Sequence, residues 1–165
     1  LQKFGKLVGS GKILDAGCLW GRDVDYFNKN GLDAAGVDKA PRPVKYAQEN
    51  MKGKFQRMEI TQLGFENEIF DGIWCNSVIH FYKPENMDKL VSELSRALKK
   101  DGILYINFKL TEGKPESDIR EEEDGSLVKR YLISPEHIKK ILKKNNLEII
   151  EEESEINTED FENPV

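Results

Sequence analysis

The chain has 165 residues, of which 38% are hydrophobic and 33% charged, and its formal net charge is −5. This length and balance predict one globular domain over residues 1–165, and no apolar run approaches the roughly 20 residues of a membrane helix. A net negative charge is not typical of proteins that bind nucleic acids, which present a basic surface to the phosphates. The composition therefore favours a small-molecule partner. Because residue 1 is Leu1 and not Met, we expect the domain to be incomplete at one or both ends.

The two cysteines, Cys18 and Cys75, each follow an apolar run that is typical of a strand. Neither has a second Cys or His at a metal-binding spacing, so no metal site is predicted. A disulfide would require an oxidising compartment, which nothing else in the sequence indicates. We therefore expect small buried thiols in a cytoplasmic protein.

Strands and helices are predicted to alternate through the first two thirds of the chain. The expected strands cover residues 12–16, 32–37, 55–60, 70–76 and 103–108. The expected helices cover residues 20–30, 44–51 and 84–98, and a further helix ends near residue 10. This alternation is typical of right-handed βαβ units, so it predicts an α/β fold with a Rossmann-like, doubly wound, mostly parallel sheet and helices on both faces.

The last third of the chain has a different character. Residues 111–126 are polar, rich in acidic side chains and interrupted by glycine and proline, which predicts a polar loop or a lid. Beyond it we expect an extended segment over 129–133, a helix that begins at Ser134 and Pro135, and a sixth strand over 147–150. The remaining residues, 151–165, are acidic and show no periodicity.

Four polar side chains stand where four successive predicted strands end. These residues are Asp15, Asp38, Glu59 and Asn76. In parallel sheets, ligands bind outside the carboxyl ends of the strands. The positions alone therefore outline a candidate site.

The glycine turn after the first strand limits the kind of ligand. Asp38 follows it at the spacing of about 20 residues that also suits the ribose of a dinucleotide. A pyrophosphate, however, needs bare glycine backbone, whereas Leu19 and Trp20 interrupt this turn. Asp15 would repel phosphate and attract a cation. A positively charged nucleoside is thus a better match than NAD.

At this point the sequence resembles the class I S-adenosylmethionine-dependent methyltransferases, in particular their small single-domain members. The resemblance covers roughly residues 12–152, and it is carried by five motifs in the family's order. These motifs are residues 13–23, Gly36-Val37-Asp38, Met58-Glu59-Ile60, residues 70–80 and residues 94–106. Leu19 stands where the family usually has a middle glycine.

The resemblance implies S-adenosylmethionine as cofactor. The residues that it places at the cofactor are Asp15, Gly17, Cys18, Leu19, Gly21, Asp38, Lys39, Glu59, Ile60 and Asn76. Within this set, the glycine turn would lie against the methionine part and Asp15 would face its amino end. Asp38 would accept from the ribose hydroxyls, Glu59 and Ile60 would meet the adenine, and Asn76 would meet the amino group.

The resemblance implies methyl transfer to a small-molecule acceptor by in-line displacement. His80 is the candidate catalytic base where the acceptor must lose a proton, because its pKa suits neutral pH. Two alternatives stay open: a methyltransferase-like binding module without activity, and an NAD-binding oxidoreductase. We expect no nucleic-acid or membrane partner, and a monomer or weak homodimer.

Overall fold

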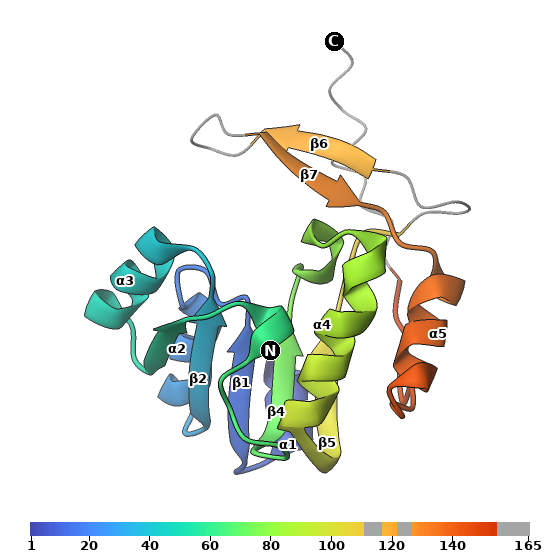
Figure 1. The fold of residues 1–165 in the computed structure, drawn as a ribbon. Coiled ribbons are helices and arrows are strands. Elements are labelled where there is room, and N and C mark those ends of the chain that lie inside the picture. Colours follow the sequence, from blue (N-terminus) through green and yellow to red (C-terminus); the bar gives the residue numbers. More distant parts are fainter. Residues whose placement is uncertain (111–116, 122–126, 155–165) are drawn as a thin grey trace.

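The computed structural model describes residues 1–110, 117–121 and 127–154, and its centre is a parallel sheet of five strands in the order β3-β2-β1-β4-β5 (Figure 1). The strands are β1 (Lys12–Ala16), β2 (Asp33–Asp38), β3 (Lys54–Arg57), β4 (Phe70–Cys75) and β5 (Leu98–Ile106). All neighbouring pairs are parallel. The chain builds outward from β1 to β3 and then returns to add β4 and β5 on the other side. The predicted α/β fold is confirmed.

Helices cover both faces of the sheet. On one face lie α1 (Gln2–Val8), α2 (Arg22–Lys29) and α3 (Pro41–Asn50), and on the other lie α4 (Pro84–Ala97) and α5 (Pro135–Lys144). The two neighbours Ile13 and Leu14 on β1 show why both faces are apolar. Ile13 packs in the cluster that contains Phe27 of α2, whereas Leu14 packs in the cluster that contains Leu90 of α4. Successive strand residues point to opposite faces of the sheet. A sheet that is covered by helices on both faces therefore needs nearly continuous apolar strands.

A second, antiparallel sheet consists of β6 (Ser117–Glu121) and β7 (Leu127–Tyr131). It lies beyond the carboxyl ends of the parallel strands, as Figure 1 shows. The loop predicted over 111–126 is therefore wrong for residues 117–121, while 111–116 and 122–126 lie outside the described residues. Pairing with β7 satisfies the backbone of β6, which its polar composition did not indicate.

Two strand predictions also need correction. The predicted strand over 147–150 is absent from the described structure, where Ile149 and Ile150 are 47% and 69% exposed and pair with no described strand. The third strand ends at Arg57, and the short 3₁₀ helix η1 (Ile60–Gln62) follows it. No helix among the described residues is long and apolar enough to span a bilayer.

Candidate functional site at the strand ends

The turn after β1 passes close to the segment that follows β4. The backbone N–H groups of Gly17 and Cys18 both donate to the carbonyl oxygen of Val37, at 2.8 and 3.0 Å, and fix the turn against the end of β2. Gly17 has φ +98°, and a Cβ built on it would lie 2.3 Å from Cγ2 of Val78. The turn therefore has room for bare backbone only.

Asp15 is a buried carboxyl group at the carboxyl-terminal half of β1, with 3% of its surface exposed. Burial raises its pKa well above the ordinary value, and the negative charges of Asp23 and Asp38 raise it further. The positive charge of Arg22 opposes this effect only in part. A cation placed beside Asp15 would favour the charged carboxylate, so the electrostatics suit a positively charged ligand.

Asp38 ends β2, and its carboxylate connects two backbone segments. The Oδ2 atom accepts a hydrogen bond from the N–H of Leu19 at 3.0 Å, and Oδ1 accepts one from the N–H of Ala40 at 2.8 Å. Leu19 has φ +44°, and 49% of its surface is exposed. The glycine turn thus keeps a left-handed conformation at Leu19, and the leucine stays outside the two core clusters.

Glu59 lies between β3 and η1, and Tyr82 is the partner that sequence reasoning missed. The Tyr82 hydroxyl donates to Oε1 of Glu59, the same oxygen that accepts from the N–H of Thr61 at 3.5 Å. The Lys39 ammonium lies 5.5 Å from the centre of the Tyr82 ring. Burial, followed by the bond to Glu59, raises the pKa of Tyr82, so its hydroxyl remains a donor at neutral pH.

Asn76 follows β4 directly, and the next residue, Ser77, has φ +59°. The N–H of Ser77 donates to the side-chain oxygen of Asn107, whose own N–H donates to the Cys75 carbonyl oxygen at 3.3 Å. Asn107 was not among the predicted site residues. It stands directly after β5, so the rule of polar residues at strand ends would have found it had the predicted strand not run to residue 108.

The remaining residues that were predicted for the site are buried or closely packed against neighbouring elements. Cys18 and Ile60 are buried in the two core clusters, and burial raises the pKa of the Cys18 thiol. Gly21, with φ +78°, precedes α2, where a Cβ would contact Phe55 at 2.6 Å. His80 lies in the 3₁₀ helix η2 (Ile79–Phe81) with 5% of its surface exposed. Its ring centre lies 4.5 Å from that of Phe81.

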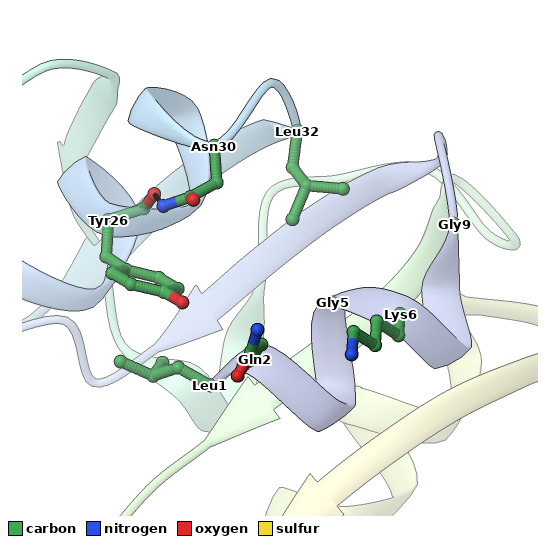
Figure 2. Close-up of a pocket in the computed structure, with 8 residues that line it drawn as sticks. All are labelled: Leu1, Gln2, Gly5, Lys6, Gly9, Tyr26, Asn30 and Leu32. Atoms are coloured by element: carbon green, nitrogen blue, oxygen red, sulfur yellow. Dashed lines mark hydrogen bonds between the residues drawn. The ribbon is translucent and has the colours of Figure 1, made fainter.

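A cavity of about 330 Å³ lies elsewhere, between α1 and the end of α2 (Figure 2). Its lining residues are Leu1, Gln2, Gly5, Lys6, Gly9, Tyr26, Asn30 and Leu32. Leu32 immediately precedes β2, so this cavity is at the amino-terminal edge of the sheet. It is therefore separate from the polar residues at the strand ends.

Comparison with known proteins points to one family. Residues 14–106 match a family model described as a methyltransferase domain. Over 109 residues the chain is 28% identical to the cyclopropane-fatty-acyl-phospholipid synthase of Escherichia coli strain K12, a match that covers 66% of this chain and 28% of that protein. The chain spans between 28% and 52% of the length of the curated relatives it matches.

The solved structures that share the fold include two methyltransferases. An S-adenosylmethionine-dependent methyltransferase from Clostridium acetobutylicum is 14% identical with a TM-score of 0.73, over 91% of this chain and 82% of that one. The 1,6-didemethyltoxoflavin-N1-methyltransferase of Burkholderia thailandensis, whose structure holds bound 1,6-didemethyltoxoflavin and S-adenosylhomocysteine, is 21% identical with a TM-score of 0.62. That match covers 87% of this chain and 64% of the Burkholderia protein.

Proposed function

Because the chain belongs to the methyltransferase domain family, we propose that it transfers a methyl group from S-adenosylmethionine to a small-molecule acceptor. The observation that carries this proposal is the meeting of a buried carboxyl, a bare glycine turn and a second carboxylate at adjacent strand ends. Asp15, Gly17 and Asp38 provide these three features. They lie at the edge of the sheet where parallel α/β folds bind ligands.

The residues fit a cationic nucleoside better than a dinucleotide. Burial and two neighbouring carboxylates make a negative charge on Asp15 unfavourable in the protein alone. The amino group or sulfonium of S-adenosylmethionine would compensate that charge, whereas a pyrophosphate would add to the repulsion. The half-exposed Leu19 side chain also leaves less bare backbone than a pyrophosphate site requires.

We assign the remaining contacts from their positions along the sheet. Asp38 accepts from the ribose hydroxyls, and Glu59, beyond the end of the neighbouring strand, accepts from the adenine amine. Ile60, whose side chain is buried in the core, contributes its backbone beside the ring. Asn76, after β4, faces the amino group on the other side of Asp15.

The bound cofactor supplies a methyl group already activated by its sulfonium. The protein therefore contributes proximity, an in-line orientation of the acceptor and exclusion of water. The hairpin of β6 and β7, beyond the strand ends, provides a cover for this region (Figure 1). His80, buried in η2 beside this hairpin, is our candidate base for acceptors that must lose a proton.

A small-molecule acceptor is supported by the acidic net charge of −5 and by the fold shared with the toxoflavin methyltransferase. A cytoplasmic location is supported by Cys18 and Cys75, which are both buried and free. Which acceptor is used depends on the segments around the strand ends, and screening methyl transfer against cell metabolites would identify it.

The cofactor assignment is tested by thermal unfolding with saturating S-adenosylmethionine, S-adenosylhomocysteine or NAD. A ligand that binds the folded state raises the apparent stability by about 2.7 kcal/mol at 100 times its dissociation constant. We expect both S-adenosyl compounds to raise the unfolding temperature. Stabilisation by NAD alone would overturn the proposal, and binding of S-adenosylmethionine without methyl transfer to any metabolite would favour a binding module.

A further inference from the structure

The hydrogen bond between Tyr82 and Glu59 joins segments that are not neighbours in the sheet. Glu59 follows β3 and Tyr82 follows η2, with β2 and β1 lying between β3 and β4. The Lys39 ammonium, next to Asp38, lies 5.5 Å from the centre of the Tyr82 ring. These three side chains form a cluster, which we call the Tyr82 cluster, beside the carboxylate that we assign to the ribose.

The Tyr82 cluster lies where the base of a nucleoside would be if its ribose were bound at Asp38. The N–H of Met58 donates to the carbonyl oxygen of Asp38 at 2.9 Å, so the segment that carries Glu59 runs directly beside Asp38. A nucleoside whose ribose is held at Asp38 has its base within reach of the neighbouring side chains. Glu59, one residue beyond Met58, is a carboxylate on this segment that can accept hydrogen bonds from an amino group.

The two oxygens of the Glu59 carboxylate differ in the hydrogen bonds that they accept within the protein. The Tyr82 hydroxyl and the Thr61 N–H both donate to Oε1, and Oε2 accepts no hydrogen bond from the described residues. Glu59 is itself exposed, so packing alone would leave its side chain several rotamers. The bond from the half-buried Tyr82 selects one of them and leaves the second oxygen for a ligand.

We propose that Tyr82 is a positioning residue for base recognition, which holds Glu59 so that its free oxygen accepts from the 6-amino group of adenine. This inference rests on the proposed cofactor. An ionised carboxylate accepts hydrogen bonds and cannot donate them. It therefore selects a base with an amino group at this position and repels one with a carbonyl oxygen, such as hypoxanthine.

The test compares the dissociation constants of S-adenosylhomocysteine and S-inosylhomocysteine, which differ in the 6-amino or 6-oxo group and, with it, in whether N1 accepts or donates a hydrogen bond. The change of this ratio in the variants, and not its absolute value, reports on Glu59. We expect the wild-type protein to prefer the adenine compound by about 10-fold or more, because a site built around a hydrogen bond rejects the analogue that lacks it. In Tyr82→Phe this ratio falls by about threefold or more, since Glu59 loses the donor that fixes it.

Two further variants separate positioning from folding. Glu59→Gln replaces the acceptor by an amide that both donates and accepts, so it lowers the ratio even if Tyr82→Phe is poorly folded. Tyr26→Phe removes the hydroxyl of another half-buried tyrosine, on α2 beside the remote cavity, and keeps the wild-type ratio. Thermal unfolding of each unliganded variant shows any loss of stability directly.

The outcomes distinguish this inference from the proposed function. If Tyr82→Phe weakens both compounds equally, or neither, its hydroxyl has no part in base recognition and the inference is overturned. The same holds if Glu59→Gln keeps the wild-type preference. If the wild-type protein binds neither compound, the proposed cofactor itself is wrong and this inference fails with it.

Discussion

The backbone N–H of Leu19 donates to Oδ2 of Asp38 at 3.0 Å. Through this bond the carboxylate at the end of β2 holds the glycine turn that follows β1. The other oxygen, Oδ1, holds the N–H of Ala40 at the start of α3, at 2.8 Å. The carboxylate that we assign to the ribose is therefore oriented by two backbone donors before any ligand arrives, and each oxygen has a second lone pair for a ribose hydroxyl.

Replacing Asp38 with alanine should affect both the turn and the ligand. The N–H groups of Leu19 and Ala40 lose their acceptor, which costs about 1–2 kcal/mol of unfolding free energy. S-adenosylhomocysteine affinity falls by about 1–3 kcal/mol, because the ribose hydroxyls lose a charged acceptor. Asp33→Ala, at the exposed opposite end of the same strand, is the matched control and should change neither quantity. Unchanged affinity in Asp38→Ala, measured by calorimetry, would place the ligand elsewhere.

Leu19→Gly tests whether the leucine hinders the cofactor. At φ +44° the leucine carries about 1–2 kcal/mol of left-handed strain, whereas glycine would lose about 0.5–1 kcal/mol through chain entropy. We therefore expect a net stabilisation of about 0–1.5 kcal/mol in denaturant unfolding. Cofactor affinity should change by less than about threefold, because the N–H bond to Asp38 remains and the left-handed backbone of the turn is kept. A tightening of tenfold or more would show that the leucine obstructs the site.

The sequence predicts the sheet well because its signals are local. Alternating apolar runs and glycine turns define β1, β2 and β4, and each buried run ends near a polar residue. Asp15, Asp38 and Asn76 consequently lie at the predicted edge of the sheet. Leu19 adopts the left-handed backbone that a glycine at its position would adopt easily, so the motif indicated the conformation even though the residue differs.

The features that the sequence did not predict are those that depend on partners far away along the chain. The Tyr82 hydroxyl bonds to Glu59 from 23 residues away, and Asn107 bonds to Ser77 from 30 residues away. Both pairs follow from the strand order and from individual side-chain rotamers, which hydrophobic periodicity does not encode. The strand β6 is hidden for the same reason, since a polar five-residue segment becomes a strand only through pairing with β7.

Gly17→Ala should disturb the turn through the segment after β4. A methyl group at this position would lie 2.3 Å from Cγ2 of Val78, and its backbone has φ +98°. Overpacking of this kind costs about 1–3 kcal/mol, to which the left-handed backbone adds about 1–2 kcal/mol. The double variant Gly17→Ala/Val78→Ala removes the contact and should recover part of the loss in a denaturant titration. No recovery would show that backbone strain alone is responsible.

The raised pKa of Asp15 links this site to pH. A carboxyl group whose pKa is higher in the folded than in the unfolded protein binds its proton more tightly in the folded state. The contribution of Asp15 to the free energy of unfolding of the unliganded protein therefore decreases as the pH rises above the ordinary pKa of 3.8, until the folded-state pKa is passed. A bound cation opposes this loss, so the cofactor should stabilise the protein more at neutral than at acidic pH.

Asp15→Asn keeps the shape of the side chain and fixes it neutral. At neutral pH we expect the unliganded variant to unfold at a higher temperature than the wild type, because the unfavourable buried charge is gone, while near pH 4 the two should converge. S-adenosylmethionine affinity should fall by about 10-fold or more, since a charge-assisted contact is lost. Unfolding temperatures from pH 4 to 8, with and without cofactor, measure both effects. A variant that is less stable at neutral pH, or that binds the cofactor as tightly, would show that Asp15 is a structural residue and not the partner of a cationic ligand.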